Sequence, residues 1–133
     1  MIKLARAAES IGSRTQHIMA SAGLSTSQFA VLDALLHLGP LCQKELGEKI
    51  LKTSGNMTMV IDNLEKGGLV FRERQIDDRR FVLVHLSDGG RALMVDLFPR
   101  HAAAISREMA ILSPAEQDEL GRLCKKLGLQ TGG

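Results

Sequence analysis

The segment from residue 54 to residue 86 constrains the fold more than any other part of the chain. Its first half carries apolar residues at the spacing i, i+3, i+4 and i+7 of one helix face, namely Met57, Val60, Ile61 and Leu64. Gly67 and Gly68 can end that helix. Two runs rich in alternating or β-branched residues follow at 69–75 and 81–86, separated by the charged turn IDDRR. The segment therefore predicts a helix followed directly by a β-hairpin.

A second short helix is expected immediately before this one. The stretch QKELGEKI at 43–50 follows a short extended piece at residues 41 and 42, and a turn of three or four residues separates it from the helix that Thr53 or Ser54 can cap. Two short helices joined in this way match the helix-turn-helix motif. With the hairpin added, the unit is predicted to be a winged helix.

The rest of the chain is expected to be helical, so the predicted fold class is mainly α with a small β-hairpin wing. Helices are expected over 2–20, 26–38 with the capping sequence SxxQ, 88–112 and 114–128 with the capping sequence SPAE. Pro99 should kink or break the third of these, because its ring removes a backbone hydrogen bond. Gly128 is expected to end the last.

We expect residues 1–133 to form a single domain, because 133 residues with 44% hydrophobic content suffice for one buried core. Residues 25–87 are predicted to be the winged-helix DNA-binding core. The flanking stretches, 1–22 and 88–128, carry apolar stripes with no evident cover beyond each other. This pattern predicts that they are dimerisation helices.

Composition excludes several other classes of protein. The net charge of +2 is only mildly basic, and the chain has no Trp or Tyr, which argues against stacking on single-stranded bases. No apolar run approaches the ~20 residues of a membrane span. No signal peptide, glycine-rich phosphate loop or nucleophile elbow is evident, so we expect a cytoplasmic protein that is not an enzyme and needs no cofactor. Cys42 and Cys124 lack metal-ligand spacing, so no metal site or disulfide is predicted, and a thiol switch at Cys42 is left as a minor alternative.

If the apolar face of the helix at 54–66 points inward, its opposite face and its first turn are available to double-stranded DNA. Short polar groups there can approach base edges and phosphates, and Asn56 is suited to adenine and Met59 to a thymine methyl. The predicted DNA-binding residues on the two helices and their turn are Lys44, Lys52, Thr53, Ser54, Asn56, Thr58 and Met59, with Lys49 a further phosphate contact. Between residues 43 and 80, however, the sequence contains eight basic and seven acidic side chains, a net charge of only +1. A DNA-binding surface therefore requires acids and bases to segregate to different faces.

The turn of the hairpin supplies a second expected contact. Adjacent arginines at its tip, Arg79 and Arg80, can enter a minor groove of negative potential. Asp78 can orient Arg80 through a charge-assisted hydrogen bond. The alternative is an ordinary solvated turn, which is what a charged hairpin tip most often is.

The run DRRFVLVHLS at 78–87 resembles the wing signature D-x-R-x-x-x-x-x-L-[TS] of the MarR family of bacterial transcription regulators. Asp78, Arg80 and Leu86 occupy the signature positions, with Ser87 where Thr is common, and the similarity extends over about residues 20–115. The resemblance implies a homodimer with interlocked terminal helices, recognition helices in successive major grooves and wings in the flanking minor grooves. The peroxide-sensing branch of the family uses a cysteine in the first helix with tyrosine partners, and this chain has neither.

The resemblance also implies a small aromatic or phenolic effector, held between the dimer helices and the winged-helix lobe. The candidate pocket residues are His17, Met19, Phe29, His37, Phe98 and His101. The alternative is that Met19, Phe29 and Phe98 are core residues and that the histidines lie at the surface or in hydrogen bonds.

The sequence as a whole predicts a homodimeric, sequence-specific regulator on a pseudo-palindromic operator in the bacterial cytoplasm, associated with the nucleoid when bound. We expect it to be a repressor released by a small ligand. A winged-helix module for protein interaction, or for non-specific DNA binding without an effector, is the alternative.

Overall fold

The structure is a computed structural model that describes residues 2–50, 54–74 and 82–131. Its elements in chain order are α1 (Ile2–Ser21), α2 (Thr26–Leu38), β1 (Leu41–Cys42), α3 (Gln43–Ile50), α4 (Ser54–Lys66), β2 (Val70–Arg74), β3 (Val82–Leu86), α5 (Asp88–Met109) and α6 (Pro114–Thr131). The predicted fold class, mainly helical with a β wing, is confirmed.

The wing strands form a small antiparallel sheet in the order β1-β3-β2. β2 and β3 pair along their full lengths, from Val70 opposite Leu86 to Arg74 opposite Val82, so the predicted hairpin is confirmed. The short extended piece before α3 is a third strand, with Leu41 opposite Val84. A strand of two residues carries no alternation from which its pairing could be inferred.

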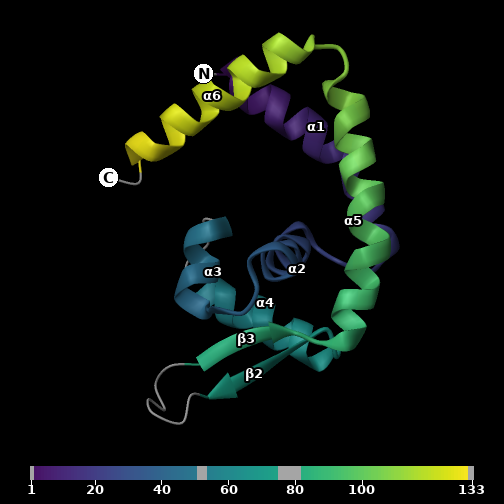
Figure 1. Ribbon diagram of the computed structural model, residues 1–133, viewed down its shortest axis with the longest axis vertical. Coiled ribbons are helices and arrows are strands. Elements are labelled where there is room, and N and C mark those ends of the chain that lie inside the picture. Colours follow the sequence, from purple (N-terminus) through teal and green to yellow (C-terminus); the bar gives the residue numbers. More distant parts are fainter. Residues whose placement is uncertain (1, 51–53, 75–81, 132–133) are drawn as a thin grey trace.

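The core lies around α2, which passes between α3, α4, the sheet and α5 (Figure 1). Three of its side chains, Val31, Leu32 and Leu35, are almost completely buried. The predicted inner face of the helix at 54–66 is also confirmed: Met57, Ile61 and Leu64 are fully buried, and Val60 packs against them from the edge. This packing fixes the opposite face of α4 toward the outside.

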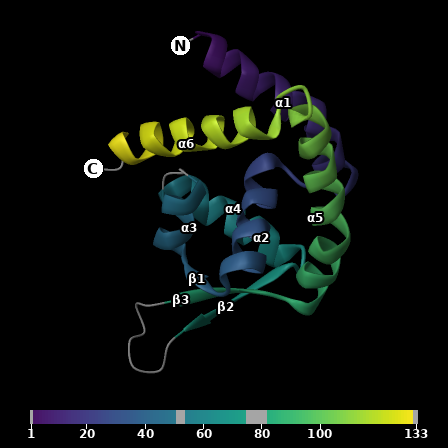
Figure 2. The same cartoon turned by 45° about the horizontal axis from the view of Figure 1, so that its top comes forward.

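α5 connects the wing to the end of the molecule where α1 and α6 lie (Figure 1, Figure 2). Of the two outcomes expected at Pro99, a kink or a break, the break does not occur: α5 continues through Pro99 and curves along its length (Figure 2). Pro99 is exposed, and water can therefore satisfy the carbonyl group that its missing N–H leaves unpaired. Arg14 Nη1 donates to Glu108 Oε2 at 3.0 Å and links α1 to this end of α5.

The predicted helix starts are more accurate than the predicted ends. Ser25, Ser87 and Ser113 each accept a hydrogen bond from the backbone N–H three residues later, as their sequences predict. The long helix ends at Met109 and not at residue 112, and α6 continues through Gly128 to Thr131. A glycine inside a helix costs only about 1 kcal/mol, so Gly128 alone does not end one.

Ser87 and Gly90 fix the junction between the wing and α5. Ser87 Oγ accepts from Gly90 N at 2.9 Å and donates to the Gly68 carbonyl at 2.7 Å, and Ser87 N donates to the Leu69 carbonyl at 3.0 Å. A Cβ atom at Gly90 would overlap the Leu69 carbonyl oxygen and lie 2.9 Å from Leu86 Cδ1. The start of α5 therefore approaches the start of β2 more closely than any side chain permits.

Gly90→Ala should lower the free energy of unfolding by about 2 kcal/mol or more, because the overlap is with backbone that cannot move aside. Gly89→Ala is the matched control, since its Cβ would meet nothing closer than 3.5 Å. We expect that control to be neutral or to stabilise by up to ~1 kcal/mol through helix propensity. Urea denaturation followed by circular dichroism measures both, and equal stabilities for the two variants would contradict this account of the junction.

Candidate nucleic-acid interface

α3 and α4 form the helix-turn-helix, and α4 presents an exposed face beside the wing. Asn56, Thr58 and Met59 all lie on the exposed part of α4, and the Met59 side chain is 63% exposed. An exposed methionine at this position suits contact with an apolar base edge. Lys44 is exposed on α3.

Several of the predicted DNA contacts fall where the structure gives no description. Ser54 is the first residue of α4. The remaining contacts in the turn and at the wing tip lie outside the described residues: Lys52, Thr53, Asp78, Arg79 and Arg80. The predicted pairing of Asp78 with Arg80 stays a prediction.

α3 begins with a hydrogen bond that also concerns charge. The Cys42 backbone N–H donates to Glu45 Oε1 at 3.0 Å, which satisfies one of the donors left free at the helix N-terminus. The same bond lowers the pKa of Glu45 below its usual value, with a further contribution from the Cys42 side chain. At the same end of α3, Gln43 Nε2 donates to Thr58 Oγ1 on α4 at 2.6 Å.

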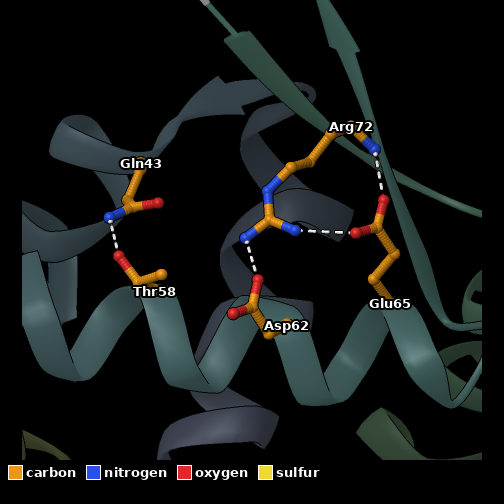
Figure 3. Close-up of polar contacts among 5 residues, drawn as sticks. All are labelled: Gln43, Thr58, Asp62, Glu65 and Arg72. Carbon is orange, nitrogen blue, oxygen red and sulfur yellow. Dashed lines mark hydrogen bonds and ion pairs between the residues drawn. The ribbon is translucent and has the colours of Figure 1, made fainter.

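A group of ion pairs between one arginine on β2 and two acidic side chains on α4 was not predicted from the sequence. Arg72 Nη2 lies 2.7 Å from Asp62 Oδ1, and Arg72 Nη1 lies 2.7 Å from Glu65 Oε1 (Figure 3). The Arg72 backbone N–H also donates to Glu65 Oε2 at 3.2 Å. We refer to Arg72 with Asp62 and Glu65 as the Arg72 clamp. The signal that could have found it is the spacing of the two acids by three residues on one helix face, followed by a strand whose alternation places an arginine on its inner side.

Four of the seven acidic side chains between residues 43 and 80 have intramolecular partners in the described residues. Of the acidic side chains between residues 43 and 80, Glu45 caps α3, and Asp62 and Glu65 bind Arg72. Glu73 Oε1 lies 3.2 Å from His85 Nε2 on the other face of the sheet, where the Phe71 and His85 rings stack with centroids 4.9 Å apart. Acids with such partners repel an approaching phosphate less than their number suggests.

A second candidate site is an open cavity of about 650 Å³ between α2, the last turn of α3 and α5. Its lining residues are Ala30, Asp33, Ala34, His37, Leu38, Lys49, Ile50 and Phe98. Two of the predicted effector residues, His37 and Phe98, therefore lie together on its wall, with ring centroids 4.6 Å apart. His37 Nδ1 lies 2.9 Å from Asp33 Oδ1 and 3.0 Å from the Asp33 carbonyl oxygen.

The other predicted effector residues do not line this cavity. The His101 ring packs against Phe29 at a tilt, with centroids 4.6 Å apart. Burial lowers the pKa of the His101 imidazole, and the Asp33 charge partly offsets this effect. Phe29 and Met19 are buried core side chains, and His17 is exposed on α1. The structure thus brings His37 and Phe98 together, places His101 and Phe29 in a second ring pair between α2 and α5, and leaves His17 apart.

No metal site is evident in residues 2–50, 54–74 and 82–131, which hold no cluster of three or more His, Cys, Asp or Glu suited to a metal ion. Cys42 is partly exposed, Cys124 is exposed, and neither forms a disulfide. Over the same residues, no helix is both apolar enough and long enough to cross a membrane.

A buried helical core, an exposed second helix and an adjacent strand pair define the winged helix-turn-helix class of DNA-binding proteins. Residues 22–80 match the MarR family. The chain is 39% identical to YkoM, an HTH-type transcriptional regulator of Bacillus subtilis, over 96% of this chain and 82% of that protein. It is 36% identical to MhqR, an HTH-type transcriptional regulator of the same species, over 96% and 88%. The chain therefore belongs to the MarR family of DNA-binding transcription regulators and is not an enzyme.

Solved structures agree on the fold. AbsC, a MarR family regulator from Streptomyces coelicolor, superposes with a TM-score of 0.91 at 20% identity, over 98% of this chain and 90% of that chain. BpsR of Bordetella bronchiseptica superposes with a TM-score of 0.84 at 28% identity, over 94% and 89%. The DNA binding of BpsR is regulated by 6-hydroxynicotinic acid.

Proposed function

We propose that this regulator is a cytoplasmic homodimer that binds a pseudo-palindromic operator, represses transcription there, and is released by a small aromatic or phenolic effector. The observation that carries the proposal is the layout of the fold. An exposed α4 beside the wing lies at one end of α5, and helices with exposed apolar side chains lie at the other (Figure 1). A single helix thus connects a DNA-reading surface to a surface suited to a second copy of the chain.

Exposed apolar side chains at the α1 and α6 end support dimerisation. The large ones are Leu4 on α1, Ile111 in the connection before α6, and Leu123 and Leu127 on α6, with Ile111 90% exposed. Apolar side chains exposed together on neighbouring elements mark interaction sites more often than chance exposure does. A twofold contact through these helices would cover them and would give the dimer two copies of α4 related by that axis.

The operator proposal is tested by nuclease footprinting on DNA from upstream of the protein's own gene. A twofold dimer reads two half-sites whose centres lie about 10 base pairs, ~34 Å, apart, since both recognition helices must enter the major groove on one face of the duplex. We expect two protected half-sites at that spacing. Uniform weak protection, or a single protected half-site, would contradict the dimeric reading of the operator.

The cavity beside α2 has the chemistry of a pocket for a hydroxylated aromatic ligand. Phe98 and His37 supply ring surface, and Lys49 supplies a positive charge that suits a ligand carboxylate. His37 Nδ1 carries at most one hydrogen, so it cannot satisfy both Asp33 oxygens, and Asp33 Oδ1 is buried. The Asp33 side chain as a whole is 40% exposed and lines the cavity, so a ligand hydroxyl group can donate to the other oxygen of its carboxylate. The regulation of BpsR by 6-hydroxynicotinic acid, a hydroxylated aromatic acid, supports the same ligand class.

The position of the cavity suggests how such a ligand releases DNA. Lys49 and Ile50 are the last two residues of α3 and form part of the cavity wall, and Phe98 belongs to α5. A ligand bound between these residues would contact both α3 of the helix-turn-helix and α5, the helix that connects the wing to the α1 and α6 end. The dimer can adopt a conformation in which the two α4 helices match the groove spacing and one in which they do not. A ligand that binds the second conformation more tightly than the first shifts the population toward it. Operator affinity then falls by at most the ratio of the ligand's affinities for the two conformations.

Phe98→Ala should leave operator binding within about threefold of wild type but weaken release by a responsive ligand about tenfold or more, since it removes the aromatic wall of the pocket. The measurement is fluorescence anisotropy of labelled operator DNA, titrated with hydroxybenzoates, hydroxynicotinate and phenols. Val95→Ala on the same helix is the control, because Val95 is exposed and does not line the cavity. A ligand that releases wild type and Phe98→Ala at equal concentration would remove this cavity from the mechanism.

A further inference from the structure

The Arg72 clamp joins the two elements that a winged helix uses to read DNA. Asp62 and Glu65 both belong to α4, and Arg72 is the central residue of β2, opposite Val84 of β3. A guanidinium group is planar and offers its donors in a fixed fork, so binding two carboxylates fixes its direction more tightly than one contact does. The bond from the Arg72 backbone N–H to Glu65 Oε2 adds a third link that involves the strand itself.

Apolar packing holds one side of the wing, where Val70 and Val84 are buried in the core, but beside the clamp the wing borders open space. A cavity of about 370 Å³ lies between the wing strands and the helices, lined by Gln43, Thr58, Arg72, Arg74, Val82 and Val84. Where side chains do not interlock, the angle between two elements depends on the polar contacts that bridge them. Besides the clamp, the contact of Gln43 with Thr58 links the first residue of α3 to α4 on the same side (Figure 3).

The clamp contributes little to the stability of the fold. The Arg72 side chain is 25% exposed, and its two acidic partners are 48% and 41% exposed. Ion pairs this accessible to water are worth about 0–1 kcal/mol each. Because the clamp adds little to stability and joins α4 to the wing, its main effect is on the orientation of the wing relative to α4.

We propose that Arg72 is a positioning residue for DNA recognition: through Asp62 and Glu65 it holds the wing at one angle to α4, so that wing and helix reach their grooves together. In this arrangement both terminal nitrogens of Arg72 and its backbone N–H donate to carboxylates of α4, so the guanidinium is directed at α4. The proposal rests on the operator recognition proposed above and names residues that determine its specificity.

Two other roles make different predictions. If Arg72 bound a DNA phosphate, its removal would weaken specific and non-specific binding alike and reduce the slope of log K against log salt by ~0.9. If Asp62 and Glu65 only repelled DNA, neutralising them would strengthen binding to every sequence. Positioning predicts the opposite sign for the acids: neutralising them weakens binding, and only to the operator.

The experiment measures anisotropy on operator DNA and on scrambled DNA, each over a salt series, for Arg72→Lys, for the double variant Asp62→Asn with Glu65→Gln, and for Glu73→Gln. Arg72→Lys keeps the charge but loses the fork. Glu73→Gln is the matched control, because Glu73 is the next residue on β2 and its carboxylate pairs with His85 on the other face of the sheet. Thermal denaturation by circular dichroism checks that each variant folds.

We expect Arg72→Lys and the double acid variant each to lose about tenfold or more in operator affinity, equivalent to one misplaced groove contact. Binding to scrambled DNA and the salt slope should stay near wild type, and Glu73→Gln should match wild type on both DNAs. Operator affinity equal to wild type in both clamp variants, or a rise in affinity for both DNAs in the double acid variant, would overturn the positioning role alone. If the wild-type protein itself shows no preference for the operator, the proposed operator recognition fails and the positioning role falls with it.

Discussion

A chain that ends at residue 112 is expected to be monomeric and to bind operator DNA about a thousandfold more weakly than the full-length protein. A monomer keeps one α4 and one wing, so it contacts a single half-site. The remaining affinity should then approach the non-specific range of ~10⁻⁴–10⁻⁶ M, compared with ~10⁻⁸ M or tighter for a specific dimer. Sedimentation equilibrium measures the mass, and anisotropy on operator DNA measures the affinity.

The truncated chain should still fold, because its core is complete without α6. All buried hydrophobic side chains of the described residues lie between Ile18 and Ala104, and α6 is fixed to the rest by a few contacts, such as those from Gln117 Nε2 to the Met109 and Leu112 carbonyls at 3.1 Å. Near-wild-type thermal unfolding of the monomer would support this point. A stable dimer from the truncated chain would show that the interface lies elsewhere.

A less severe variant tests the same surface with α6 in place. Leu123→Glu combined with Leu127→Glu puts two charges on the exposed face of α6, where the leucine side chains are 43% and 52% exposed. In a monomer these changes cost little, since both positions are already solvated. In a dimer interface they bury unpaired charge, so the variant should dissociate at micromolar protein concentration.

Met59→Asp is expected to produce the second largest loss, at least a hundredfold in operator affinity. Met59 is 63% exposed, so an aspartate there should not disturb the core. In the major groove it would replace an apolar contact with a charge that the surrounding phosphates repel, at a cost of several kcal/mol. Anisotropy on operator and scrambled DNA measures the loss, which should be larger on the operator.

The control for this change is Val95→Asp, which places the same charge at a position with the same 63% exposure on α5. Both variants should unfold at temperatures close to that of wild type. If Met59→Asp binds the operator as tightly as Val95→Asp, the exposed face of α4 does not enter the groove and the winged helix serves another role.

Much of the fold could be predicted because periodicity and capping are local properties. Apolar spacing identified α4, and the serines at residues 25, 87 and 113 marked helix starts. Alternation located β2, and β-branched content located β3. Helix ends were predicted less well, because Gly128 and Pro99 are tolerated inside helices where the surrounding turns and solvent compensate.

The candidate site was only partly predictable for a physical reason. Exposure of Asn56, Thr58 and Met59 follows from the helix period, so it could be inferred from the chain alone. The spacing of the two acids and the alternation of β2 are compatible with the Arg72 clamp, but its formation also depends on the angle at which β2 crosses α4, which these local patterns do not determine. The same holds for the cavity, since Lys49 and Phe98 meet there only through the packing of α3 and α5 around α2.

The most direct test of the central claim, that the protein is a dimeric and sequence-specific regulator, is an anisotropy titration of the wild-type protein. The two DNAs are its own upstream region and a scrambled duplex of the same composition, each measured over a salt series. We predict binding to the upstream DNA that is at least a thousandfold tighter than to the scrambled DNA, with log K falling steeply against log salt on both. Equal, weak binding to the two DNAs would contradict the claim and would leave a winged helix that binds DNA without specificity or serves protein interaction.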